Sequence, residues 1–159
     1  MVSVELVSVG VVEETASVIL VLRAPELERF LVMEVGLLEG RAIALEAGGV
    51  KTPRPLTHEL THRVMEALGA TLQRVVICDY RDKVFYANLE LQTADGRTVR
   101  VDSRPSDALA LALRTGAPVV AAEAVLAEAG VTEADLRSEE EAGVGEENES
   151  GGEKEPVLH

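Results

Sequence analysis

Two short stretches of this chain combine an arginine, a proline, a hydroxyl and an acid just ahead of an apolar run. They are Arg54-Pro55-Leu56-Thr57-His58-Glu59 and Arg104-Pro105-Ser106-Asp107. Proline suits the first position of a helix because its missing N–H would have no partner there, and hydroxyls and carboxylates accept hydrogen bonds from the other free N–H groups. A helix N-terminus also holds phosphate oxygens readily. We therefore predict two helix entrances and look there first for chemistry.

The second stretch offers a carboxylate pair for a divalent metal. Asp102 is expected at the end of a strand and Asp107 in the first turn of the next helix, so one corner could present both. Mg²⁺ or Mn²⁺ held by two carboxylates can activate water and stabilise the charge that builds on phosphorus during phosphodiester hydrolysis. Arg104 lies between them and could clamp a phosphate. The structural alternative is that Asp107 caps its helix and Arg104 pairs with Asp102.

The first stretch adds acid–base candidates. His58 and Glu59 are candidate catalytic residues, since histidine changes charge near neutral pH. Arg54 and Ser106 are candidate substrate contacts. Ser106, like Thr57, also fits a capping role, so a purely structural interpretation stays open for each stretch.

A competing motif overlaps the first stretch. His58-Glu59-Leu60-Thr61-His62 matches the H-E-x-x-H pattern, in which two histidines bind zinc and the glutamate activates water. Three features disfavour a zinc peptidase. The motif starts in the first helical turn, the charged Arg63 follows it directly, and no third ligand is evident.

The hydrophobic pattern predicts an α+β fold in which several helices pack on a mixed or antiparallel sheet. We expect strands over residues 2–12, 17–24, 29–35, 71–79 and 84–93, a strand through Val99 and Val101, and a short strand near Val119. Helices are expected after Gly36 and over about 55–68, 105–115 and 123–129, with Thr132 and Asp135 capping a final one. In the last hairpin a three-residue loop through Arg97 would place Leu91 opposite Val101 and Glu90 opposite Asp102.

Charge and composition set the broad class. The 159 residues fit one domain over residues 1–136, followed by an acidic tail, 137–159, that is too poor in apolar side chains to fold. The tail holds eight of the 28 acids and two of the 15 basic residues, so the net charge of −13 falls to −7 for the domain. Such an acidic body allows only weak, local contact with nucleic acid. One cysteine and no long apolar run predict a cytoplasmic protein without a membrane segment.

Four motifs then carry a family resemblance. They are Gly36-Leu37-Leu38-Glu39 with Ala42-Ile43, Arg54 to Leu60, Phe85-Tyr86-Ala87, and Asp102 to Ala108 with Ala117-Pro118-Val119. In order and spacing this set resembles the bifunctional nuclease (BFN) domain family over about residues 2–131. The resemblance implies a compact α+β domain that self-associates as a homo-oligomer, and a nuclease with both RNase and DNase activity. The family commonly has aspartate at the position of Glu59.

An alternative of another class is a non-catalytic, self-associating interaction module. The acidic charge favours it, as do the scarce aromatic residues: two tyrosines, two phenylalanines and no tryptophan. A small metal site can nevertheless cleave a phosphodiester without a large basic face, and we therefore expect a metal-dependent nuclease.

Overall fold

A seven-stranded mixed sheet forms the centre of the protein, seen here in a computed structural model that describes residues 1–144, with side chains as far as Ser138. The strands are β1 (Val2–Val12), β2 (Ser17–Ala24), β3 (Arg29–Gly36), β4 (Thr71–Arg81), β5 (Val84–Gln92), β6 (Thr98–Ser103) and β7 (Val119–Ala121). Their order across the sheet is β3-β2-β1-β7-β4-β5-β6. Strands β4 and β7 are parallel, and the other neighbours are antiparallel.

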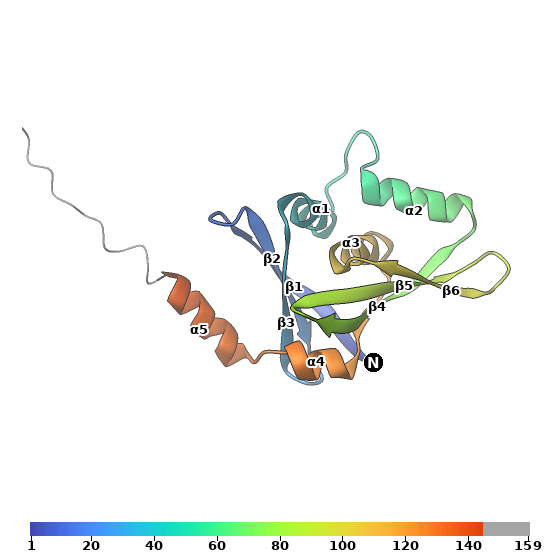
Figure 1. Ribbon diagram of the computed structural model, residues 1–159. Coiled ribbons are helices and arrows are strands. Elements are labelled where there is room, and N and C mark those ends of the chain that lie inside the picture. The colour runs from blue at the N-terminus through green and yellow to red at the C-terminus, as the bar shows by residue number, and fades with distance from the viewer. Residues whose placement is uncertain (145–159) are drawn as a thin grey trace, which may run out of the picture.

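Five helices accompany this sheet. They are α1 (Leu37–Ala47), α2 (Thr57–Ala67), α3 (Pro105–Thr115), α4 (Glu123–Ala129) and α5 (Glu133–Val144). In Figure 1, α1, α2 and α3 lie together on one side of the molecule, whereas α4 lies on the opposite side against β3 and β4. The predicted α+β class, the mixed sheet and the single domain are confirmed. None of the helices in the described part of the chain is long and apolar enough to cross a membrane.

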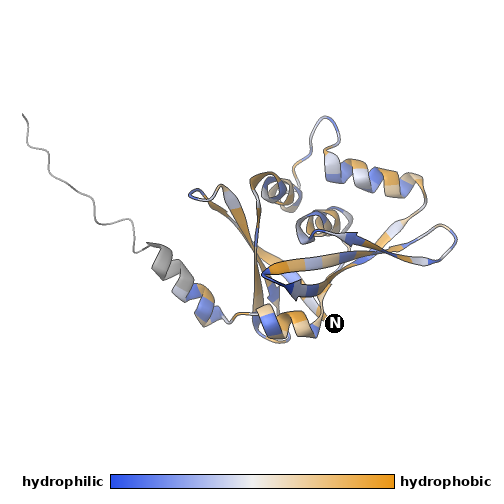
Figure 2. Cartoon of the chain, in the orientation of Figure 1, coloured by the Kyte–Doolittle hydropathy of each residue, from blue (hydrophilic) through white to orange (hydrophobic). Residues whose placement is uncertain are grey.

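Helix α3 is the most buried helix, and it joins two hydrophobic clusters. Leu109 and Ala110 belong to a cluster built mainly by β1, β2, β3, α1 and α4, with one residue each from β4 and β7. Leu111 and Ala112 belong to the cluster built by β4, β5 and α2. Apolar and polar residues alternate along many of the strands (Figure 2), as expected for strands with one face in the core. The start of α3 is therefore held firmly in place from both sides.

The two predicted helix entrances differ in detail. Helix α3 begins at Pro105 as predicted, with Arg104 as its N-cap residue, but α2 begins at Thr57, two residues after Pro55, with Leu56 as its N-cap residue. Neither N-cap side chain accepts a hydrogen bond from a backbone N–H of its helix. The prediction that Thr57 and Ser106 are the capping residues is therefore wrong, and the first-turn N–H groups have no N-cap side chain to accept from them.

Gly40 brings α1 close to the sheet. A Cβ atom at this position would lie 2.3 to 2.7 Å from three carbons of the Val18 side chain, well inside van der Waals contact. Any larger residue would push α1 away from β2, and with it the adjacent Glu39.

The β5–β6 hairpin corrects the predicted register. Leu91 is paired with Val99 instead of Val101, so Glu90 faces Arg100 and Asp102 faces Asn88. The loop does have three residues, 94–96, because the Thr93 N–H donates to the Arg97 carbonyl, but it starts one residue earlier than predicted. The like-charge pair of Glu90 with Asp102, which hinted at a nearby metal, does not form.

The last described helix crosses the predicted boundary between domain and tail. Thr132 and Asp135 cap α5 as predicted: the Asp135 carboxylate accepts from the Thr132 N–H, and the Thr132 hydroxyl accepts from the Asp135 N–H. Helix α5 continues to Val144, beyond the predicted domain end at Leu136. The rest of the predicted tail, 145–159, lies outside the described residues.

Candidate active site

The entrances of α2 and α3 meet at one pair of side chains. His58, in the first turn of α2, places its Nε2 2.9 Å from Oδ1 of Asp107, in the first turn of α3. The side chain of His58 is 16% exposed and that of Asp107 is 32% exposed. Two residues that the sequence marked separately are thus joined in one contact.

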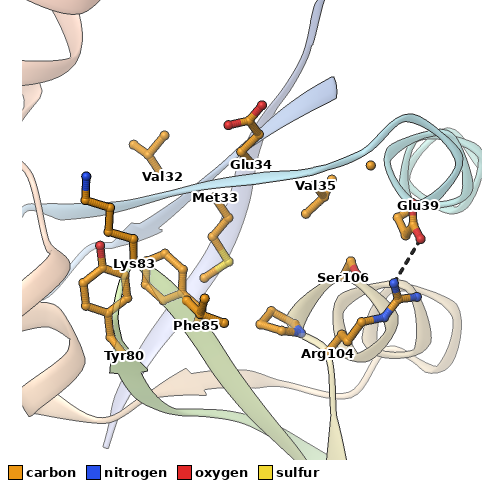
Figure 3. A pocket seen from close by; sticks show the side chains of 13 residues that line it. Val32, Met33, Glu34, Val35, Glu39, Tyr80, Lys83, Phe85, Arg104 and Ser106 are labelled. Carbon is orange, nitrogen blue, oxygen red and sulfur yellow. Dashed lines mark hydrogen bonds and ion pairs between the residues drawn. The ribbon is translucent and has the colours of Figure 1, made fainter. Parts of the chain in front are cut away.

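Arg104 ties Asp107 to a third element. Its Nε donates to Oδ2 of Asp107 over 2.8 Å, and one terminal nitrogen donates to Oδ1 over 3.2 Å. The other terminal nitrogen donates to Oε1 of Glu39 in α1 over 3.1 Å, the dashed contact in Figure 3. The side chains of Glu39, His58, Arg104 and Asp107 form what we call the helix-entrance cluster.

This arrangement keeps both carboxylates ionised. Burial opposes ionisation of Asp107, but hydrogen bonds and charge interactions from Arg104 and His58 outweigh it, so the pKa of Asp107 lies below its ordinary value. A bond from its own backbone N–H, followed by the bond from Arg104, lowers the pKa of Glu39. An ionised Asp107 favours the histidine tautomer that carries a proton on Nε2.

The cluster lines an open groove between α1 and α2. Its volume is about 900 Å³, and His58, Asp107, Arg104 and Glu39 contribute to its wall beside apolar residues such as Leu38. A groove of this size admits a segment of a polymer. Within the described residues no hydrogen bond occupies the Nδ1 atom of His58, which is one of the residues that line this groove.

Asp102 lies apart from this cluster. It is exposed and paired with Asn88, whose amide contacts Sγ of Cys78. The neighbouring Val101 is paired with Leu89, which belongs to the same cluster as the α3 core residues. Because alternate side chains of a strand project from opposite faces, Asp102 points away from the face that α3 covers. The structure does not bring Asp102 and Asp107 together.

Glu59 and His62 point to other partners. Glu59 pairs with Arg63 over 2.7 Å and with Arg114 of α3 over 2.8 Å, while His62 lies 3.7 Å from Glu66. The side chains of the H-E-x-x-H motif are thus engaged separately and do not converge. Glu59 instead joins α2 to α3 through Arg114. Arg114 also contacts Glu46 of α1, so the same arginine links all three helices.

The two remaining candidates are placed differently. Arg54 is exposed in the loop before α2, where its carbonyl accepts from the Thr52 hydroxyl. Ser106 is buried and lines a second pocket, which Glu39 and Arg104 also line. Among residues with described side chains, no three histidine, cysteine or carboxylate groups gather closely enough to hold a metal ion.

Glu39 was not among the predicted site residues, although it lies in one of the family motifs. The sequence did offer one indication, because Glu39 is an acid in the first turn of α1, directly after Gly36. What the sequence did not show is that α1 lies beside the start of α3, which places Glu39 within reach of Arg104.

Comparison with known proteins identifies relatives of the chain. A family described as "Bifunctional nuclease domain" matches residues 20–134. Two proteins of Mycobacterium tuberculosis, from strains CDC 1551 and H37Rv, are each 42% identical over 137 residues, which cover 86% of this chain and 81% of theirs. Both are described as uncharacterized proteins.

Proposed function

Since the chain belongs to the bifunctional nuclease domain family, we propose that it hydrolyses phosphodiester bonds in RNA and DNA at the helix-entrance cluster. The observation that carries this proposal is the contact between His58 and Asp107 next to Arg104, in the wall of an open groove. The three side chains combine a proton-transfer group, a carboxylate that orients it and a cation for phosphate.

His58 is the proposed acid–base group. If Nε2 donates to the ionised Asp107, then Nδ1 carries a lone pair and can take a proton from an attacking hydroxyl or water. Asp107 holds the ring in that tautomer and stabilises the imidazolium that follows. The imidazolium then gives its proton to the leaving oxygen as the bond of that oxygen to phosphorus breaks. In RNA the attacking group can be the neighbouring 2′-hydroxyl, whereas DNA requires water.

Arg104 is the proposed phosphate contact. Three of the five guanidinium N–H groups are used on Asp107 and Glu39, which leaves two for phosphate oxygens, and the side chain is 64% exposed. The start of each of the two helices also lines the groove. Backbone N–H groups there, which no N-cap side chain occupies, add to its attraction for anions.

A divalent cation remains part of the proposal. With His58 neutral, two carboxylates face one guanidinium, so the cluster has a net charge of −1 and repels a polyanion unless a cation assists. Asp102 points away from the face of the sheet that α3 covers, so it cannot share one ion with Asp107, and no step is assigned to that pair. Glu39 and Asp107 are the carboxylates that would hold Mg²⁺ or Mn²⁺ in the groove, in competition with Arg104. Such an ion would supply charge neutralisation at the phosphate.

Cleavage of end-labelled single-stranded RNA and DNA by the purified protein tests the proposal. We expect cleavage in Mg²⁺ or Mn²⁺ that EDTA abolishes, and a fall in kcat/KM of roughly 100-fold or more for His58→Gln, which removes the acid–base group. His62→Gln is the matched control, because His62 lies on the same helix but its one polar partner in the described part of the chain is Glu66. Equal activity of the two variants, or no cleavage by the folded protein with any metal, would contradict the proposal.

A second candidate function rests on an exposed apolar stripe. Leu60, Val64 and Leu68 follow one another at four-residue intervals along α2 and are 53%, 49% and 74% exposed. Such a stripe suits self-association, as an interaction module would need. The test is the mass in solution by light scattering: Val64→Glu should turn a homo-oligomer into monomers, and an unchanged mass would exclude this stripe from the contact.

A further inference from the structure

A second pocket adjoins the proposed active site. Its volume is about 620 Å³, and it lies between β3, the β4–β5 turn and the start of α3 (Figure 3). Glu39 and Arg104 line this pocket as well as the groove of His58, so the two cavities share these residues as a wall. The volume is in the range of pockets that hold small molecules of nucleotide size.

One end of the pocket is aromatic. The rings of Tyr80 and Phe85 lie with their centres 4.5 Å apart, and both pack partly buried against the main core cluster. Met33 points toward Phe85 from β3 (Figure 3). Half of the chain's four tyrosine and phenylalanine residues therefore line one cavity. Aromatic rings and a thioether form a surface suited to another flat ring.

Positively charged side chains lie at both ends of this pocket. Lys83 stands beside Tyr80 at one end and Arg104 at the other (Figure 3). The backbone of Lys83 is set by a tight turn, in which Asp82 and Lys83 have φ of 50° and 64° and Tyr80 is paired with Phe85. Two cations at opposite ends of an aromatic pocket match a nucleotide within a strand, which has a phosphate on each side.

The third wall is an edge of the sheet. Strand β3 is the outermost strand, with β2 as its ladder partner, so part of its backbone N–H and C=O groups face away from the ladder. Residues 32–36 of this strand line the pocket. Free backbone donors and acceptors can bond to the polar edge of a base, whichever base it is.

We propose that this pocket binds one unpaired nucleotide of the substrate, next to the bond that is cleaved. Its base stacks on Tyr80 and Phe85, and its two flanking phosphates contact Lys83 and Arg104. A base within a duplex cannot enter such a pocket without leaving its stack, so the preferred substrates are single strands and unpaired loops. This inference rests on the proposed nuclease function and deepens it.

Methyl NMR of methionine-labelled protein tests the pocket without any need for cleavage. The chain has three methionines: Met33 lines the pocket, Met65 is a buried residue of α2, and Met1 is the first residue. Adenosine 5′-monophosphate should shift the Met33 methyl signal through the ring current of its base, and leave Met65 unshifted. Ribose 5-phosphate, which lacks the base, should bind at least tenfold more weakly.

Two variants with a matched control complete the test. Phe85→Leu keeps an apolar side chain but removes the stacking ring, and it should weaken binding of the nucleotide roughly tenfold. Lys83→Asn keeps a residue that adopts positive φ and should weaken binding at low salt. Lys51→Asn, in an exposed loop that lines neither cavity, is the control and should bind normally.

The outcomes separate this inference from the proposed function. A Met33 shift that both pocket variants weaken supports the inference, and so does faster cleavage of single-stranded than of duplex oligonucleotides. If the protein cleaves nucleic acid but adenosine 5′-monophosphate leaves Met33 unshifted, or ribose 5-phosphate binds equally well, the inference is overturned while the nuclease proposal stands. If Met33 shifts but nothing is cleaved, the pocket stands and the nuclease proposal is overturned.

Discussion

Nε2 of His58 lies 2.9 Å from Oδ1 of Asp107, although 49 positions separate the two residues in the chain. Each side chain stands in the first turn of a helix, so their contact also fixes how α2 approaches α3. A large change at either residue would therefore disturb both the chemistry and the packing. Replacements of equal size separate the two effects.

Asp107→Asn should lower kcat/KM for a single-stranded oligonucleotide at least tenfold, because a neutral amide neither stabilises an imidazolium nor fixes the tautomer of His58. Asp102→Asn should change it less than about twofold, because that side chain lies on the other face of the sheet. Both variants should keep the circular dichroism of the parent. Similar losses for the two would instead favour a metal held by both carboxylates.

Acid should remove part of the stability that Asp107 provides. The folded protein holds the pKa of Asp107 below its ordinary value, so this contribution is complete above the unfolded pKa of about 3.9 and is lost as pH falls through the lower, folded value. Because the side chain is about one-third exposed, the effect should be about 1 kcal/mol or less.

Urea unfolding at pH 7, 4.5 and 3 measures this effect. The wild type should lose more stability between pH 4.5 and 3 than Asp107→Asn does, because the amide does not titrate. Parallel pH profiles for the two proteins would show that Asp107 contributes nothing.

Gly40→Ala should destabilise the protein by about 1–3 kcal/mol, since the new methyl group meets Val18 and overpacks the contact of α1 with β2. The free energy of urea unfolding measures it. The double variant Gly40→Ala, Val18→Ala should recover part of the loss by making room. If Gly40→Ala alone proves neutral, α1 can shift freely and does not fix the position of Glu39.

Arg114→Met should lower the midpoint of urea unfolding, because Glu46 of α1 and Glu59 of α2 lose their shared partner in α3. Arg63→Met is the control: Arg63 also contacts Glu59, but its side chain is 60% exposed and, among the described residues, bridges no second helix. A larger effect for Arg63→Met would show that Arg114 does not hold the three helices together.

Local structure was predictable where the deciding residues are neighbours in the chain. The bounds of β1 and β2 and of α3 and α4 agree with the hydrophobic pattern, and Gly116, with φ of 73°, ends α3 as expected. The β5–β6 register was wrong because the loop begins at Ala94 and has Gly96 at positive φ as its last residue. Both registers bury the same face, so the apolar pattern did not distinguish them.

The site was predictable only as a set of candidates. His58, Asp107 and Arg104 stand out by residue type and position, but their contacts depend on helices packed from distant parts of the chain. For the same reason the predicted partner of Asp107 was Asp102, which is close in sequence but lies on the other face of the sheet, and Glu39 was not predicted. Tyr80 and Phe85 likewise line a pocket only because β3 lies close to the β4–β5 turn, which the sequence did not show.

Helix α3 takes part in both hydrophobic clusters, and this has a consequence for how the protein can work. The part of the sheet formed by β1, β2 and β3 cannot separate from the part formed by β4 and β5 without exposing the apolar side chains of α3 to water. The residues at its start therefore have no independent hinge, and the proposed substrates would be accommodated by side-chain movement and by the loops around the groove. The arrangement of the helix-entrance cluster is therefore retained for as long as the molecule stays folded.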